Sequence, residues 1–138
     1  MKIQIIKYRE YNKPFRAHYN DAGADVYALD NYTIKPHDTI KIPLGFGIKV
    51  PNGYQCGVYP RSSMAAKGII SQIPPIDSGY TGEIHCILTN TSNKVYYITK
   101  NDRIAQLLVT PIVICDFVEE LGEERGTGGF GSTDKEVR

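Results

Sequence analysis

Tryptophan is absent from this sequence of 138 residues, and cysteine and methionine are scarce, with three and two copies. Charge of one sign is also lacking, because 16 Lys and Arg face 15 Asp and Glu, a formal charge of +1. Domains that bind nucleic acid are usually strongly basic, so no stable nucleic-acid binding is expected. No apolar run approaches the ~20 residues of a membrane span, and the N-terminus shows no export signal. We therefore expect one soluble domain without membrane contact, acting in the cytoplasm.

The three cysteines, Cys56, Cys86 and Cys115, are far apart, and each lies in a stretch of alternating apolar residues. Metal sites need clustered ligands, and a catalytic thiol usually lies near a turn or helix start with a basic neighbour. We interpret all three as buried, reduced core residues, which favours a reducing compartment. The histidines stand singly and are assigned no chemistry: His18, His37 and His85.

Alternation of apolar and polar residues is the main structural signal. Every second residue from Ile40 to Val50 is apolar, which is the period of a β-strand. Further strands are expected in stretches that alternate or are rich in β-branched and aromatic residues: 54–58, 84–88, 94–98, 104–109 and 112–118. Only residues 62–67 look helical, with Ser62 as the cap and Gly68 as the terminator. The pattern predicts an all-β fold, a jelly-roll barrel or sandwich with one short helix.

The chain changes character at Glu119, because residues 119–138 are rich in glycine and poor in large apolar side chains. Such a segment cannot bury a core of its own. We therefore divide the chain into a β domain over residues 1–118 and a flexible C-terminal arm over residues 119–138.

The glycine-rich strip from Gly126 to Gly131 satisfies the spacing G-x-G-x-x-G. A dinucleotide-binding fold needs a helix after that loop, and too few residues follow. What remains is a backbone whose N–H groups can approach an anion closely, with donors from Arg125, Ser132 and Thr133 nearby. Phe130 could lie flat on a nucleobase, or the whole strip could be a frayed end.

Two further stretches carry chemistry. Arg61, Ser62 and Ser63 stand between a strand and the short helix, where an anion could bind; the alternative is a helix cap with a solvated Arg. Asp77 and Tyr80 are three residues apart in a turn-rich segment, where Asp77 could also be a simple turn former.

Together these stretches resemble the five short motifs of the trimeric dUTPase (dUTP pyrophosphatase) family, in order and over nearly the whole chain. The matching residues are 21–26, 60–65, 76–82, 101–107 and 125–133. The resemblance implies a β jelly roll that forms a homotrimer, with active sites at subunit boundaries and the C-terminal arm closing over a neighbouring site. It also implies Mg²⁺-assisted hydrolysis of dUTP to dUMP and pyrophosphate, which keeps uracil out of DNA and supplies dUMP for dTMP synthesis. A viral source would place this activity in the host cytoplasm or nucleus.

By similarity, Asp77 deprotonates the water that attacks the α-phosphorus, and Tyr80 packs against the deoxyribose. Phe130 would cover the uracil. The remaining residues implied to bind substrate, most of them at the triphosphate, are Arg61, Ser62, Ser63, Ser71, Gln106, Arg125, Gly131, Ser132 and Thr133. Mg²⁺ would be carried by the phosphates with no direct protein ligand, and Asp25 would reach it at most through water.

Some residues leave alternatives open. Pro74 stands where relatives usually carry glycine, and proline removes an N–H donor, which puts base selectivity in question. Asp25 could instead bind nearby backbone N–H groups, while Asp102 and Arg103 are read as a turn and an internal ion pair. The rival functions are a dCTP deaminase, a bifunctional deaminase-dUTPase of the same fold, and a noncatalytic trimer that binds nucleotides or a regulatory protein partner.

Overall fold

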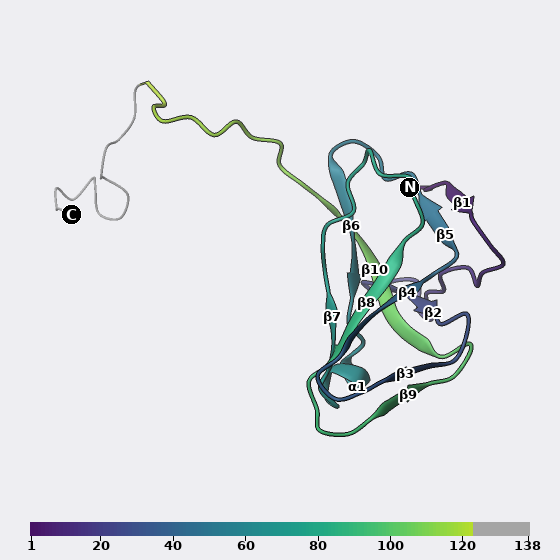
Figure 1. The fold of residues 1–138 in the computed structure, drawn as a ribbon. Coiled ribbons are helices and arrows are strands. Elements are labelled where there is room, and N and C mark those ends of the chain that lie inside the picture. Colours follow the sequence, from purple (N-terminus) through teal and green to yellow (C-terminus); the bar gives the residue numbers. More distant parts are fainter. Residues whose placement is uncertain (123–138) are drawn as a thin grey trace.

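The structure is a computed structural model that describes residues 1–122, and these residues form ten β-strands and one short helix (Figure 1). The expectation of an all-β fold with one short helix is confirmed. No helix in the described part of the chain is long and apolar enough to cross a membrane.

The strands follow one another along the chain with a single helix between the sixth and seventh. They are β1 (Ile5–Lys7), β2 (Ala24–Tyr27), β3 (Tyr32–Ile34), β4 (Thr39–Pro43), β5 (Phe46–Ile48), β6 (Tyr54–Tyr59), β7 (Ile69–Gln72), β8 (His85–Asn90), β9 (Tyr96–Ile98) and β10 (Arg103–Pro111). The helix α1 spans Ser62–Ala65.

Two three-stranded antiparallel sheets form the body of the fold, in the orders β2-β10-β6 and β4-β8-β7. Two small antiparallel pairs, β1-β5 and β3-β9, complete it. The central strand β10 places Gln106 opposite Asp25 on one side and opposite Tyr59 on the other. This register brings residues of three sequence stretches to the same part of the sheet.

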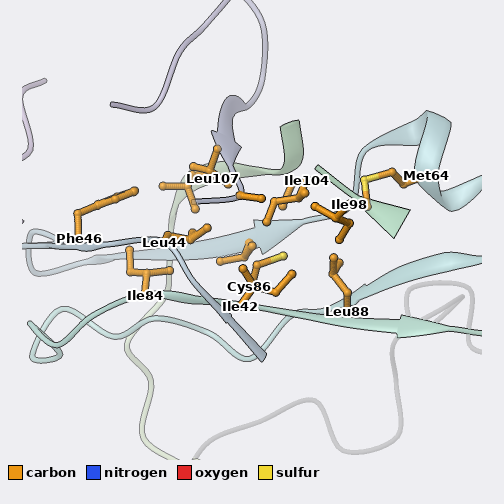
Figure 2. Close-up of a cluster of buried hydrophobic side chains, with 14 of the residues drawn as sticks. Ile42, Leu44, Phe46, Met64, Ile84, Cys86, Leu88, Ile98, Ile104 and Leu107 are labelled. Atoms are coloured by element: carbon orange, nitrogen blue, oxygen red, sulfur yellow. The ribbon is translucent and has the colours of Figure 1, made fainter. Parts of the chain in front are cut away.

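A single hydrophobic core joins the two sheets. Figure 2 shows Ile42 and Leu88 from one sheet lying close to Ile104 from the other, with Met64 of the helix at the edge of the cluster. Along β7 and β8 every second residue is buried, because successive side chains of a strand point to opposite faces. Cys56 and Cys86 belong to this core, as predicted.

The alternation from Ile40 to Val50 is not one strand but two, β4 and β5. Gly45 separates them with a φ of +87°, a conformation that side-chain-bearing residues rarely adopt. The local period of two continues across this break, so the sequence pattern alone does not show it.

The expected helix cap is also different. The residue before the first helical turn is Arg61, in an extended conformation and without a side-chain cap bond, while Ser62 is the first helical residue. Gly68 follows the helix with a φ of +84°, which agrees with its predicted role as terminator.

Residues 112–118 form no strand within the described chain, although their composition predicts one. Beyond Pro111 the chain runs away from the body of the fold as an extended segment (Figure 1). Val113 and Phe117 are 85% and 94% exposed, and Cys115 is exposed as well, so its predicted burial is wrong. Alternation identifies the residues that favour a sheet, but it does not supply the partner strand.

Candidate active site

The segment that carries Asp77, residues 74–83, is fastened to the body of the fold at Ile76. Ile76 exchanges two backbone hydrogen bonds with Cys56 of β6, with N···O distances of 2.8 and 3.1 Å. The next residue is Asp77, which is exposed, and its carbonyl oxygen accepts a bond from the N–H of Tyr80 at 3.0 Å. We call this segment the Asp77 hairpin. It holds an exposed carboxylate next to an anchor in the core.

Tyr80 is held in one orientation by its neighbours. Its hydroxyl donates to the carbonyl oxygen of Glu83 at 2.9 Å. A Cβ on Gly82 would lie 2.5 Å from the Tyr80 hydroxyl oxygen, so only glycine leaves room for the ring in this position. The aromatic ring is therefore a fixed surface beside Asp77.

Asp77 and Tyr80 line a cleft of about 250 Å³. Apolar side chains contribute to its lining: Val58 of β6, Ile76 of the hairpin, Ile87 of β8, and Ile84, which lies between the hairpin and β8. The polar and proline residues around it are Lys41, Gln72, Pro74, Pro75, Glu83 and His85. A cleft with apolar walls and a few polar groups at its edge suits a flat heterocyclic ring. Because proline has no N–H, Pro74 and Pro75 offer this cleft carbonyl groups only.

A second cluster of sequence-predicted residues lies where β2, β6 and β10 meet. The Asp25 carboxylate is 3.6 Å from Arg103 Nη1 and 4.0 Å from Arg61 Nε. Arg61 also donates from Nη1 to the carbonyl oxygen of Arg103 at 3.2 Å. We call these three residues the arginine cluster. Asp25 thus pairs with two guanidinium groups, and the hydrogen bond to the Arg103 carbonyl oxygen further orients Arg61.

Gln106 lies beside this cluster because β10 places it opposite Asp25. Its Nε2 donates to the carbonyl oxygen of Pro60 at 2.9 Å. A Cβ on Gly23 would lie 2.4 Å from Gln106 Oε1, so the glycine of the first motif leaves room for the Gln106 side chain. Ser62 and Ser63 are exposed in the helix that follows Arg61. The structure therefore brings Arg61, Ser62, Ser63 and Gln106 into one neighbourhood.

The remaining predicted residues either serve the fold or lie outside the described residues. The Ser71 side chain is buried, and its hydroxyl donates to the carbonyl oxygen of Val58 at 3.0 Å, so the fold itself uses that group. Asp102 accepts the N–H of Thr99 at 2.9 Å, as a turn residue does, while Arg103 takes its ion pair with Asp25. The predicted substrate-binding residues of the C-terminal arm lie outside the described residues: Arg125, Phe130, Gly131, Ser132 and Thr133.

The Asp77 hairpin and the arginine cluster are attached to different ends of β6. The hairpin is bonded to Cys56, near the start of the strand, whereas Arg61 follows its end. The four steps from Cys56 to Pro60 span roughly 13 Å at the ~3.3 Å rise of a strand. None of Arg61, Ser62, Ser63 and Gln106 lines the cleft that contains Asp77. In one copy of the chain, Asp77 and the arginine cluster therefore do not share a cleft.

Sequence reasoning missed the residues that hold the hairpin from outside. Arg9 Nη2 donates to Glu83 Oε1 at 2.8 Å, and the Tyr8 hydroxyl donates to the carbonyl oxygen of Thr81 at 2.6 Å. These partners are more than seventy residues apart in the chain. Their only sequence signal is a charged or aromatic residue near the N-terminus, which is too common to single out.

A divalent ion would find few protein ligands in the described part of the chain. Residues 1–122 contain no group of three or more His, Cys, Asp or Glu side chains placed to hold a metal. Asp25, the carboxylate predicted to be nearest to Mg²⁺, already faces two arginines. This donor set fits an ion bound mainly by phosphate oxygens and water, which is the usual environment of Mg²⁺ beside a nucleotide.

The sequence matches one protein family, both in a family model and in individual relatives. A sequence model of the dUTPase family matches residues 9–134. The deoxyuridine 5'-triphosphate nucleotidohydrolase of Wolbachia pipientis subsp. Culex pipiens is 40% identical over 130 residues, covering 87% of this chain and 85% of that protein. The protein of the same name from Clostridium tetani is 37% identical over 141 residues, covering 98% and 97%.

Solved structures of phage proteins share the fold. The dUTPase of phage phi11 of Staphylococcus aureus superimposes with a TM-score of 0.81 at 22% identity, covering 90% of this chain and 100% of that chain. A variant of the Staphylococcus bacteriophage 80alpha dUTPase, solved with dUpNHpp, superimposes with a TM-score of 0.80 at 25% identity, covering 96% and 98%. A structural Mg(II) ion has been described for a variant of the phi11 protein.

Proposed function

The chain belongs to the dUTPase family and is a dUTP nucleotidohydrolase, and from this premise we propose that Asp77 is the base of the reaction. Its exposed carboxylate stands at the edge of the cleft, directly after a residue fixed to the core. A water held by this carboxylate attacks the α-phosphorus of dUTP and gives its proton to Asp77. The bond from the α-phosphorus to the bridging oxygen breaks, and dUMP and pyrophosphate leave.

Tyr80 is the wall against which the deoxyribose packs. Because the Tyr80 hydroxyl is bonded to the carbonyl oxygen of Glu83, the ring cannot turn to accept a larger sugar. A ribose would place its 2′-hydroxyl against the ring face, where no polar partner is offered. The uracil ring then lies in the adjoining cleft, between the apolar walls and the carbonyl groups of Pro74 and Pro75.

The cations that neutralise the triphosphate come from the arginine cluster and its surroundings. Arg61 supplies a planar fork of donors suited to phosphate, and Gln106, Ser62 and Ser63 add neutral donors. Hydrolysis at phosphorus depends more on such charge neutralisation and positioning than on a strong base. Of the predicted substrate-binding residues in the described chain, Ser71 is supported least, because Val58 takes its hydroxyl.

In this proposal Mg²⁺ and the C-terminal arm complete the binding site for the triphosphate. Mg²⁺ would neutralise charge on the phosphate oxygens, and Asp25 would reach it at most through a bound water. Arg125, Ser132 and Thr133 add donors to the phosphates, Gly131 allows the backbone to approach closely, and Phe130 covers the uracil.

We place the complete site between copies of the chain in a homotrimer. What supports this is the separation of the Asp77 hairpin from the arginine cluster along β6, which leaves each incomplete in one copy. A second observation is the exposed apolar segment of residues 112–121, which needs a cover that its own copy does not provide. A groove whose lining includes Ile3, Ile5, Leu107 and Val109 together with the basic residues Lys13 and Arg16 is a suitable receptor on a neighbour.

The assembly is tested by two truncated chains. A chain that ends at Pro111 should be monomeric in sedimentation, because it lacks the exposed apolar segment. A matched chain that ends at Gly122 keeps the segment and should stay trimeric. If the shorter chain is also trimeric, the segment does not hold the copies together.

The substrate is tested by measuring pyrophosphate release and ammonia release in parallel on dUTP, dCTP, dTTP and UTP. Pyrophosphate from dUTP, with no ammonia from dCTP, supports the proposed reaction. Ammonia from dCTP would instead indicate a deaminase or bifunctional enzyme of this fold. Binding without either product would indicate a noncatalytic trimer, for which a regulatory protein partner would be sought.

We further propose that the protein acts in the cytoplasm, or in the host cytoplasm or nucleus if its source is viral. What supports a reducing compartment is that the described cysteines are all free thiols.

A further inference from the structure

Each of the three oxygen atoms of Glu83, the last residue of the Asp77 hairpin, accepts a hydrogen bond. Its carboxylate oxygens accept separate bonds, Oε1 from Arg9 Nη2 at 2.8 Å and Oε2 from the N–H of Gly45 at 2.9 Å. Its carbonyl oxygen accepts the Tyr80 hydroxyl at 2.9 Å. Its side chain is only 13% exposed, whereas that of Arg9 is 54% exposed. One residue thus links Tyr80 to the N-terminal segment.

A second link joins the same two parts of the chain. The Tyr8 hydroxyl donates to the carbonyl oxygen of Thr81 at 2.6 Å. The backbone N–H groups of Tyr8 and Arg9 both donate to the carbonyl oxygen of Gly45, at 2.9 and 3.1 Å. Glu83 and the N-terminal segment are therefore fastened to the same turn, between β4 and β5.

The hairpin also lies directly on β5. A Cβ on Gly47 would lie 2.4 Å from the carbonyl oxygen of Gly82 and 2.8 Å from that of Thr81. This close approach leaves the base of the hairpin no room to shift toward the body of the fold. Movement away from the body is opposed by the bonds from Tyr8 and Arg9.

We propose that Arg9 and Glu83 are positioning residues that set the selectivity for deoxyribose by fixing the ring of Tyr80. This inference rests on the proposed function, in which Tyr80 packs against the sugar. A wall excludes a 2′-hydroxyl only if it cannot retreat, so selectivity requires a supporting shell as well as the ring itself. Glu83 provides that support through its carbonyl oxygen, and Arg9 fixes Glu83.

Replacing one carboxylate oxygen of Glu83 by an NH₂ group is expected to weaken this support. Both carboxylate oxygens face N–H donors, from Arg9 and from the backbone of Gly45. A glutamine can offer one acceptor only, and its NH₂ group would meet a donor on the other side. Glu83→Gln therefore disturbs the support while keeping nearly the same shape and volume.

The experiment compares kcat/KM for dUTP with kcat/KM for UTP in Arg9→Met and Glu83→Gln. We expect the dUTP-to-UTP ratio to fall about tenfold in both variants, mainly through better use of UTP, since a small displacement of a positioning contact is enough to change such ratios. Arg9→Lys keeps a charged donor and should recover much of the ratio. A general loss of stability would not raise the use of UTP.

The matched control is Lys7→Met. Lys7 forms an ion pair with Glu10 at 2.7 Å, two residues from Arg9, but this pair does not involve the hairpin. The control removes the same charge and should leave the ratio unchanged. If Lys7→Met lowers the ratio as much as Arg9→Met, the effect is one of net charge and the inference is overturned.

Tyr80→Ala separates failure of this inference from failure of the proposed function. If Tyr80→Ala leaves the dUTP-to-UTP ratio unchanged, the role of Tyr80 at the sugar is wrong. If Tyr80→Ala lowers the ratio but Arg9→Met and Glu83→Gln behave as wild type, Tyr80 reads the sugar without this support and the inference alone is overturned. Should Glu83→Gln fail to fold, Arg9→Met decides the outcome, because the Arg9 side chain is half exposed and its loss leaves the core intact.

Discussion

The Asp77 hairpin and the arginine cluster are built in different ways. Backbone bonds to Cys56 and a close approach to Gly47 fix the hairpin, and its walls are largely apolar. The arginine cluster is held by longer ion pairs of 3.6 and 4.0 Å among side chains. A base must be placed accurately with respect to one phosphorus atom, whereas charge neutralisation acts over longer distances and tolerates adjustment. The difference in construction therefore matches the different chemical tasks that we propose for the two regions.

The largest expected effect comes from removing the base at the hairpin. Asp77→Asn keeps the shape of the side chain but cannot accept a proton from water, so turnover should fall by about 10²- to 10⁴-fold. Binding of a nonhydrolysable dUTP analogue should change little. Steady-state pyrophosphate release measures the turnover, and calorimetry measures the binding of the analogue. The control is Asp38→Asn, at an exposed aspartate outside the hairpin, which should keep wild-type turnover. If the turnover of Asp77→Asn stays within a few-fold of wild type, Asp77 is not the base.

A smaller effect is expected at the arginine cluster. Arg61→Met should lower kcat/KM for dUTP by about 10²-fold, the scale for losing one donor to the transition-state charge. Arg61→Lys keeps the charge but loses the planar fork, so its loss should be intermediate. Equal kinetics for Arg61→Met and wild type would mean that the cluster does not contact the triphosphate.

The effect expected to be smallest on catalysis concerns stability and two buried thiols, Cys56 of β6 and Cys86 of β8. Burial raises the pKa of the Cys56 thiol to about 11 and that of the Cys86 thiol to about 12. In the unfolded chain a thiol ionises near pH ~8.5, so above that pH the folded state binds more protons than the unfolded state. Stability is therefore full below about pH 8.5 and is lost as pH rises toward the folded pKa values, by about 1.4 kcal/mol per thiol and pH unit.

Urea unfolding between about pH 8 and pH 10 checks this expectation. The double variant Cys56→Ala and Cys86→Ala should be less stable at neutral pH because of the cavities, but its stability should depend less on pH. Cys115→Ala is the control, since Cys115 is exposed in the structure. An equally steep loss of stability in the double variant would assign the alkaline transition to other groups.

Local patterns predicted six of the ten strands in the described chain, the short helix and part of the site, and missed β1, β2, β3 and β7. The period of two identified β4, β5, β6 and β8, and richness in β-branched and aromatic residues identified β9 and β10. Gly68 marked the end of the helix because glycine readily adopts positive φ. The position of Asp77 in a turn followed from the small and flexible residues around it. These features depend on neighbours in the sequence, which a single sequence does show.

What could not be predicted depends on partners far away in the chain or in another copy. The ion pair between Arg9 and Glu83 joins positions 74 residues apart, and no local pattern records it. The apolar residues 112–118 were assigned to a strand and Cys115 to the core, yet the segment is exposed, because alternation does not show which surface covers it. Asp25 pairs with two arginines instead of the backbone N–H groups considered from the sequence, since the register of β10 decides its neighbours.

The most direct test of the account is whether the two regions can be supplied by different copies of the chain. Asp77→Asn and Arg61→Met should each be nearly inactive alone. If one site takes its hairpin from one copy and its arginine cluster from another, random mixed trimers of equal amounts should regain activity at about one quarter of their sites. If native mass spectrometry confirms mixed trimers and the mixture stays inactive, both regions belong to a site within one copy, and the shared-site account is wrong.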